Sequence, residues 1–130
     1  MMWRYDRKAG IWSLDGPDPI VLPDCYAGNG VYRNDPAAEG VKDHGPLPGG
    51  VYTIGELEAQ HGTLGRDVFR LIPDDETRAR IIALGRGPDS FYCHGRNPTR
   101  PMDSSCGCIV ADHGARIIIA HSPIKQVQVI

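Results

Sequence analysis

Short runs of β-branched and aromatic residues, each closed by glycine or proline, most restrict how this chain can fold. Its 130 residues include 16 glycines and 11 prolines, so turns are frequent and long helices are disfavoured. Val51–Ile54 is the clearest strand by its β-branched and aromatic content. The length suits a single domain that buries a core without covalent staples. We therefore predict one domain spanning residues 1–130, mainly β, with one or two short helices.

Several elements can be placed from the pattern of apolar residues. Trp3–Tyr5 and Ile11–Leu14 alternate large apolar and polar side chains around a turn, which predicts a hairpin. An acidic start at Asp74–Glu76, followed by apolar residues at helical spacing, predicts one helix that ends before Gly85. Four more strands are expected, the last of which should close the sheet: Ile20–Leu22, Val68–Ile72, Arg116–Ala120 and Gln126–Ile130.

Three segments have no clear strand pattern. Tyr26–Gly50 is irregular and rich in glycine and proline, which favours a fixed surface loop. Gly55–Gly65 is ambiguous, with one helical turn expected around Glu56–Glu58. Ala111–Ala115 is expected to form a turn.

The stretch Phe91–Val110 contains the residues best suited to chemistry. It opens with an expected strand that leads into His94, and it closes with Cys108 before an apolar pair. The loop between them holds Pro98 and Pro101 and cannot pair regularly, because proline lacks the amide donor. A histidine at the end of one strand and a cysteine at the start of the next can face each other across a sheet. This arrangement gives a cysteine nucleophile its base.

Gly107, directly before this cysteine, is a candidate for a second role. A residue without a Cβ atom lets a substrate approach the backbone closely. The backbone amides of Gly107 and Cys108 are therefore candidates to stabilise a developing oxyanion.

Composition disfavours several other classes of function. The net charge of −2 and the pI near 6.2 give no basic field for nucleic acid. No apolar run reaches membrane-spanning length, so membrane insertion is not expected. The N-terminus lacks the apolar core of a signal peptide, which predicts synthesis in the cytoplasm without ordinary secretion. Four cysteines in such a chain do not require disulfides.

Five segments form a recognisable combination: Tyr26–Gly28, Asn34–Pro36, Gly45–Ile54, His94–Gly95 and Ser105–Ile109. Together they resemble the L,D-transpeptidase-like effector family of type VI secretion systems, from about Trp3 to the C-terminus. The His-Gly and Ser-x-Gly-Cys pair is similar to the signature of the wider L,D-transpeptidase catalytic domain. The proline- and glycine-rich segment is more specific, because short Cys/His motifs recur by chance.

The resemblance implies a β-sandwich or barrel that acts on the stem peptides of peptidoglycan. Such proteins attack the amide after the third residue, usually meso-diaminopimelate, and form a cysteine thioester without a cofactor. When water accepts the acyl group from the thioester, the enzyme is an L,D-carboxypeptidase. When an amine accepts it, the reaction is exchange or cross-linking. Delivery by a secretion apparatus into the periplasm of a target bacterium is implied, together with a cognate immunity protein.

The resemblance also assigns residues. Cys108 is the expected nucleophile, His94 its base, and the Gly95 carbonyl orients the imidazole, while the amide of Gly107 contributes to the oxyanion site. The expected substrate-binding residues are Ser105, Arg116 and Tyr92.

The chain departs from the wider domain at two positions. Cys106 stands where a second histidine is usual, and Val110 stands where an arginine is usual. These departures leave the nucleophile assignment intact but weaken the prediction of substrate anchoring. Arg116 is either a carboxylate binder or a structural residue.

Two other hypotheses remain open. The protein could bind peptidoglycan or a partner without cutting it, in which case Cys108 should be an unreactive thiol. Alternatively, Cys93, His94, Cys106 and Cys108 could ligate zinc. The adjacent Cys93 and His94 argue against zinc, because neighbours on a strand point to opposite faces. Among the other histidines, His113 is the main rival base, and the rest, including His61, are interpreted as surface or cap residues.

Overall fold

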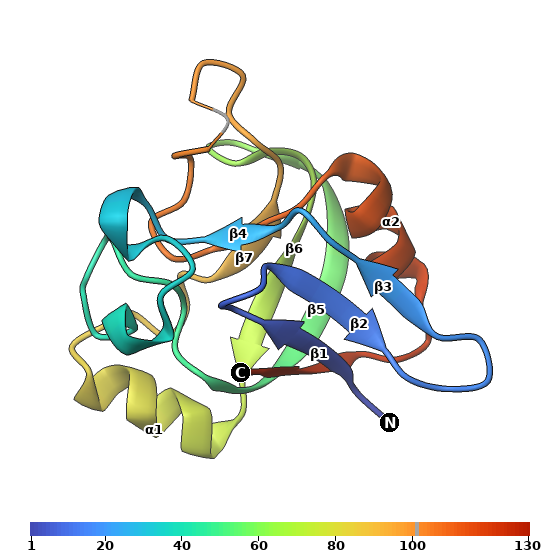
Figure 1. Ribbon diagram of the computed structural model, residues 1–130, viewed down its shortest axis with the longest axis horizontal. Coiled ribbons are helices and arrows are strands. Elements are labelled where there is room, and N and C mark those ends of the chain that lie inside the picture. Colours follow the sequence, from blue (N-terminus) through green and yellow to red (C-terminus); the bar gives the residue numbers. More distant parts are fainter. Residues whose placement is uncertain (101) are drawn as a thin grey trace.

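The computed structural model describes residues 1–100 and 102–130, which form one nine-stranded sheet and two α-helices (Figure 1). The mainly β class predicted from the sequence is confirmed. Pro101, expected in the loop before Cys108, lies outside the described residues. The elements are β1 (Trp3–Asp6), β2 (Ile11–Leu14), β3 (Ile20–Leu22), β4 (Tyr26–Ala27), the 3-10 helices η1 (Gly30–Tyr32) and η2 (Pro36–Ala38), β5 (Gly50–His61), β6 (Gly65–Pro73), α1 (Asp75–Ala83), β7 (Tyr92–His94), β8 (Ile109–Val110), α2 (His113–His121) and β9 (Gln126–Val129).

The sheet is mixed and curls over its own core. Its strand order is β3-β2-β1-β9-β5-β6-β7-β8-β4. Three strands separate β2 from β6 in this order, yet the rings of Trp12 on β2 and Phe69 on β6 lie 6.2 Å apart. Figure 1 shows β1 and β2 passing across β5 and β6. The large buried side chains therefore fill the space between the two halves of one sheet: Trp3, Tyr5, Trp12, Tyr52, Phe69, Leu71 and Ile81.

The predicted hairpin and the predicted first helix are confirmed. β1 and β2 pair antiparallel, with Tyr5 opposite Trp12. The helix α1 begins after Asp74, whose side chain accepts a hydrogen bond from the Thr77 amide at 2.9 Å. It ends before Gly85, which has a φ of +79° that suits glycine after a helix. The strands predicted at Ile20–Leu22, Val51–Ile54 and Val68–Ile72 are also present.

The strand predicted at Arg116–Ala120 is wrong, because this segment lies in the helix α2. Arg116, Ile119 and Ala120 are buried, whereas Ile118 is exposed. Burial at positions i, i+3 and i+4 is the period of a helix with one face on the core. A short apolar run does not distinguish a strand from a buried helix. The turn predicted at Ala111–Ala115 is likewise replaced from His113 onward by this helix.

The helical turn predicted at Glu56–Glu58 is also wrong. The strand β5 continues through it, with Leu57 opposite Phe69 on β6 and a register shift after Ile54. Pairing along most of β6 outweighs the weak helical preference of three residues. The last predicted strand does form as β9, but it lies inside the sheet between β1 and β5.

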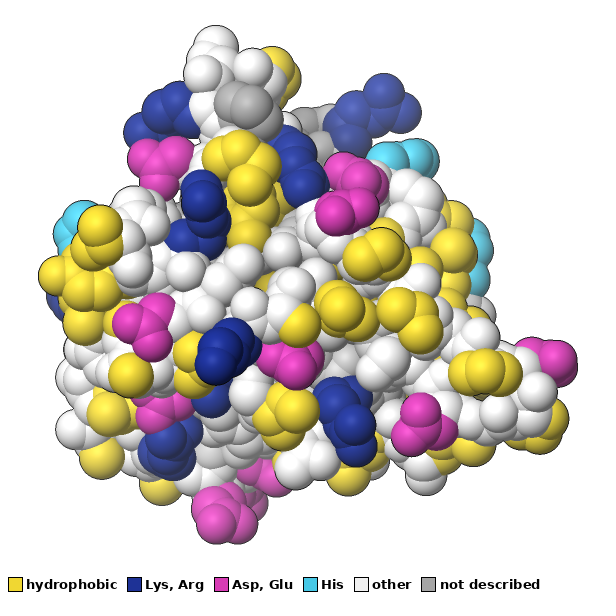
Figure 2. Space-filling view, viewed as in Figure 1, with side chains coloured by type: hydrophobic (Ala, Val, Ile, Leu, Met, Phe, Trp, Pro, Cys, Tyr) yellow, Lys and Arg dark blue, Asp and Glu magenta, His cyan; other side chains and the backbone are white. Residues whose placement is uncertain are grey.

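The surface mixes charges of both signs. Figure 2 shows Lys and Arg side chains interspersed with Asp and Glu on the face drawn, as expected for a net charge of −2. Among the described residues, no helix has both the length and the apolar character needed to cross a membrane.

Candidate active site

Strands β7 and β8 bring the histidine and the cysteine to one end of the sheet. They pair in parallel, with Cys93 opposite Ile109 and His94 opposite Val110. Side chains alternate between faces along a strand, so Cys93 and His94 point in opposite directions. Cys93 is fully buried in the core. Cys108, one residue before β8, lines the same cavity as His94.

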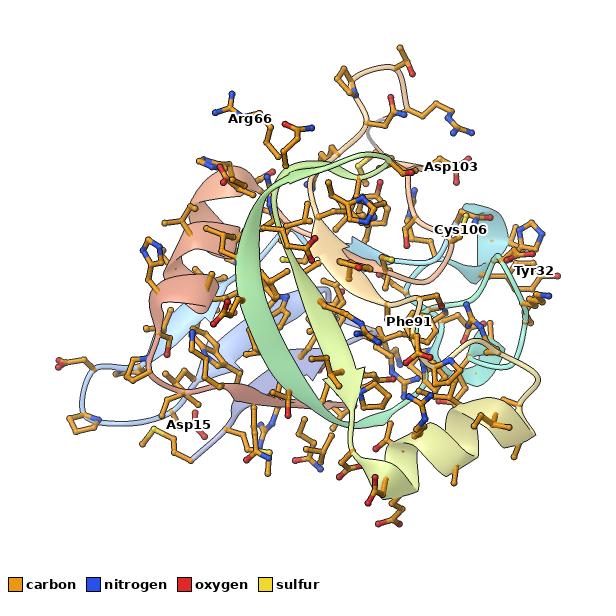
Figure 3. All side chains as sticks on the ribbon, turned by 180° about the vertical axis from the view of Figure 1, so that it is seen from behind. Asp15, Tyr32, Arg66, Phe91, Asp103 and Cys106 are labelled. Atoms are coloured by element: carbon orange, nitrogen blue, oxygen red, sulfur yellow. The ribbon has the colours of Figure 1, made fainter. Side chains whose placement is uncertain are left out.

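The cavity has a volume of about 790 Å³ and lies between two segments far apart in the sequence. One is the turn that joins β5 to β6, and the other is the loop between β7 and β8, both at the same end of the ribbon (Figure 1). Figure 3 labels Arg66 at the first segment and Asp103 and Cys106 on the second. The lining of the cavity includes the side chains of His61, Tyr92, His94, Cys106 and Cys108.

His94 is held as a neutral imidazole with one nitrogen available. Its Nδ1 lies 2.8 Å from the carbonyl oxygen of Gly95. A carbonyl only accepts, so Nδ1–H is the donor and Nε2 keeps its lone pair. Burial lowers the pKa of His94, and the charge of Arg116 acts in the same direction, although the Gly95 contact opposes them. The ring is therefore an unprotonated base at neutral pH.

The thiol of Cys108 is half-buried and in contact with main-chain groups. Its Sγ accepts a hydrogen bond from the Tyr92 amide at 3.3 Å and lies 3.5 Å from the Ser90 carbonyl oxygen. Burial raises the pKa of Cys108 to about 11, and the Tyr92 amide partly opposes this effect. Both pKa shifts favour a thiol and a neutral imidazole over a thiolate–imidazolium pair.

Ser105 organises the loop that carries the cysteine. Its Oγ accepts hydrogen bonds from the amides of Gly28 and Gly107, both at 3.0 Å, and donates to the Cys108 carbonyl at 2.6 Å. The side chain is buried, so its hydroxyl is fully used within the protein. The Gly107 amide, predicted to face an oxyanion, is directed at Ser105 in this state.

Gly107 is required by packing as well as by conformation. Its φ is +132°, which side chains with a Cβ rarely adopt. A Cβ here would lie 2.6 Å from Nη2 of Arg86 and 3.0 Å from the Phe91 ring. The glycine therefore lets the cysteine loop sit directly on a buried arginine.

Arg86 had no predicted role, and no local sequence pattern indicates one. Its guanidinium is buried and donates to the carbonyl oxygens of Glu39, Gly45, Pro46 and Cys106 at 2.8 to 3.1 Å. The Leu47 amide also donates to the Gly107 carbonyl at 2.9 Å. These contacts hold the Gly45–Gly50 segment against the back of the cysteine loop. The sequence interpreted this segment as a groove wall or a tight connection, and none of its residues is in the described cavity lining.

Arg116 lines the cavity, but its guanidinium is bound to the main chain. It donates to the carbonyl oxygens of Asp67 at 2.8 Å, Ala111 at 2.6 Å and Arg66 at 3.3 Å. A Cβ on Gly95 would lie 2.9 Å from its Nη1. These contacts join the start of β6 to the end of β8 directly behind the histidine.

His61 lines the cavity, whereas the sequence interpretation gave it as a surface or cap residue. Its ring lies 5.0 Å from the ring of Tyr92, edge to face, and both line the cavity. His113, the predicted rival base, is exposed, and its Nε2 lies 2.8 Å from the Asp67 carboxylate. No local signal distinguishes the two histidines, because only the β5–β6 pairing brings His61 to the site.

The zinc hypothesis finds no ligand set in the part of the chain that the structure describes. Within residues 1–100 and 102–130, no three His, Cys, Asp or Glu side chains are grouped so that they could hold a metal ion. All four cysteines are free thiols. Cys106 is exposed at the cavity, whereas Cys25 is buried in the core.

The fold and this cavity define a small, mainly β protein with a histidine at the end of one strand and a cysteine directly before the neighbouring strand. Residues 23–129 match the family model described as the Tlde1 domain, so the chain belongs to the Tlde1 family of type VI secretion effectors. No curated protein sequence matches the chain. Among solved structures, that of Bdellovibrio bacteriovorus Bd1075 is similar, with a TM-score of 0.65 and 16% identity. The match covers 99% of this chain and 47% of that one, and at this identity it shows the fold alone.

Proposed function

We propose that the protein is a cysteine-dependent enzyme that modifies the stem peptides of peptidoglycan. The observation that carries this proposal is the shared cavity of Cys108 and His94, in which the histidine is neutral and oriented by Gly95. Membership of the Tlde1 family supports the substrate class. The reaction is cleavage of the amide after the third residue, usually meso-diaminopimelate, by an L,D-carboxypeptidase or by L,D-transpeptidase exchange.

In this mechanism the proton moves as the sulfur attacks. Nε2 of His94 takes the thiol proton while Sγ of Cys108 bonds to the scissile carbonyl carbon. The Tyr92 amide, 3.3 Å from Sγ, stabilises negative charge on the sulfur until the bond has formed. The carbon–nitrogen bond then breaks, and His94 returns the proton to the leaving amine. Water or an amine next attacks the thioester and releases Cys108.

Oxyanion stabilisation is assigned to the backbone next to the nucleophile. The Cys108 amide is one candidate donor. The Gly107 amide is the other, and it must first leave Ser105 Oγ, 3.0 Å away. Arg116 holds the frame behind His94 through its main-chain contacts, so its role in this proposal is positioning.

The charge of the cavity favours an anionic peptide. Four arginines are among its described lining residues, and no Asp or Glu is. Stem peptides carry free carboxylates, which such a cavity attracts. The arginines are Arg66, Arg96, Arg100 and Arg116.

The pH dependence of kcat/KM should follow the protonation of His94. Protonated His94 cannot act as a base, so activity should fall as pH decreases through its pKa. Because burial lowers that pKa, we expect the acid limb below the usual histidine value of about 6.5. A profile of kcat/KM on a defined muropeptide from pH 4 to pH 9 measures this limb. An acid limb well above 6.5 would contradict the neutral-base mechanism.

A non-catalytic binding function is favoured by one observation, the raised pKa of Cys108. A protonated thiol in the free protein reacts slowly with alkylating agents in either case, so alkylation of the free protein does not separate the two functions. Intact-protein mass spectrometry after mixing with muropeptides does. An acyl adduct on Cys108 or trimmed tripeptide stems supports the enzyme, whereas an unmodified protein bound to unchanged muropeptide supports the binding module.

The effector role leads to a prediction in cells. We expect the chain with an added periplasmic signal to kill a Gram-negative host, and the same chain without the signal to be tolerated, because the substrate lies in the periplasm. Viable counts after induction measure this effect. The Cys108→Ala variant with the signal is the matched control and should be harmless. A cognate immunity protein should restore growth when it is exported to the same compartment.

A further inference from the structure

The turn between β5 and β6 forms one wall of the cavity. We call residues 61–66 the hairpin tip; most of them line the cavity, and His61 pairs with Gly65 across it. In the middle of β6, Phe69 pairs with Cys93 on β7, so β6 runs beside the strand that carries His94. The hairpin tip is therefore fixed to the catalytic strand by the sheet itself.

The ring of His61 is held in one tautomer by this tip. Its Nδ1 accepts hydrogen bonds from the amides of Thr63 at 3.2 Å and Leu64 at 3.1 Å. An acceptor nitrogen carries no proton, so the proton of the neutral ring is on Nε2. The edge-to-face contact with Tyr92 at 5.0 Å fixes the ring plane as well. His61 thus presents an oriented N–H donor at the cavity wall.

The surrounding charges indicate what this donor receives. Arg96 is already bound to the Asp112 carboxylate, and Arg116 to main-chain carbonyls. Arg66, which belongs to the hairpin tip, and Arg100 are exposed, and neither forms an ion pair within the part of the chain described. With no acidic residue in the described lining, this side of the cavity suits a carboxylate.

We propose that His61 is a substrate-binding residue whose Nε2–H donates to a carboxylate of the stem peptide. The proposal rests on the proposed function and names one of its specificity determinants. A stem tetrapeptide offers three carboxylates: the α-carboxylate of D-glutamate, the side-chain carboxylate of diaminopimelate and the terminal carboxylate. The interaction orients the peptide before the chemical step, so its loss should raise KM and leave kcat nearly unchanged.

The test compares three proteins and four substrates. His61→Phe keeps an aromatic ring against Tyr92 but has no donor. His61→Asn keeps an oxygen that can accept from the Thr63 amide, as Asn side chains do in turns, but is too short to reach a substrate. Steady-state kinetics are measured for both variants and the wild type on the stem tetrapeptide and on three versions, each amidated at one carboxylate. Melting temperatures monitor the fold.

We expect both variants to lose about 10- to 100-fold in kcat/KM on the unmodified peptide, the range for a hydrogen bond to a charged group. Amidation at one carboxylate should reduce kcat/KM for the wild type but much less for either variant, which identifies the group bound. If His61→Asn had the kcat and KM of the wild type, His61 would act only as a structural cap of the turn, and the proposal would be overturned. If amidation lowered kcat/KM by the same factor in the wild type and in both variants, the proposal would also be overturned. If the wild type forms no product from any peptide, the proposed function itself fails.

Discussion

Replacing Cys108 with alanine is expected to abolish turnover of muropeptides, by a factor of about 10³ or more, because the substitution removes the proposed nucleophile. The acyl adduct should disappear from the intact-protein mass spectrum at the same time. Chromatography of muropeptides before and after treatment measures the loss. The Cys108 side chain is half-buried and makes few contacts, so the variant should remain folded.

Two further variants test whether the cysteine acts with His94. His94→Ala should be as inactive as Cys108→Ala, since residues that act as a unit do not lose activity additively. Cys106→Ala should keep at least part of the activity, because Cys106 is exposed at the cavity and has no assigned step. Equal and complete loss in all three variants would contradict the catalytic pair.

Replacing Arg86 with methionine is expected to give the largest loss of stability. The substitution leaves the carbonyl oxygens of Glu39, Gly45, Pro46 and Cys106 without their buried donor. Each unsatisfied buried group costs about 1–3 kcal/mol, so we expect the free energy of unfolding to fall by at least about 3 kcal/mol. Because the same contacts support the cysteine loop, kcat should also fall at temperatures where the variant is still folded.

Denaturant unfolding of Arg86→Met and of a matched surface variant measures this effect. Arg78→Met is the control, since Arg78 forms an ion pair with Asp89 at the surface, where solvent screens the two charges. If both variants unfold at the same denaturant concentration, the Arg86 contacts are not a principal support of the cysteine loop. A stable Arg86→Met protein with wild-type kcat would contradict both parts of the prediction.

Local patterns predicted elements whose signals lie within a few residues. The hairpin of β1 and β2 follows from alternation, and α1 follows from an acidic start capped by Asp74 and a glycine after its end. The secondary structure predicted from the sequence was wrong where contacts with distant segments outweigh local preferences. Glu56–Glu58 joins a strand because β6 pairs with it, and Arg116–Ala120 becomes a helix because one of its faces meets the core.

The candidate site likewise contains residues that the sequence identified and residues that only the structure revealed. Cys108 and His94 could be named from the sequence as a candidate pair. β7 and β8 are parallel, so the two residues lie near one another only because these strands are two or three residues long. The roles of Arg86 and His61 could not be predicted, since each depends on segments far apart in the sequence. Arg86 binds carbonyls about 40 positions away, and His61 reaches the cavity only through the β5–β6 hairpin.

The sequence by itself therefore determined the β class and identified Cys108 and His94 as a candidate catalytic pair. Only the tertiary structure decided the surroundings of that pair: burial raises the pKa of Cys108 and lowers that of His94, and Gly95 orients the ring. The physical reason is that a pKa depends on the water and the dipoles around a group, and the curled sheet sets both.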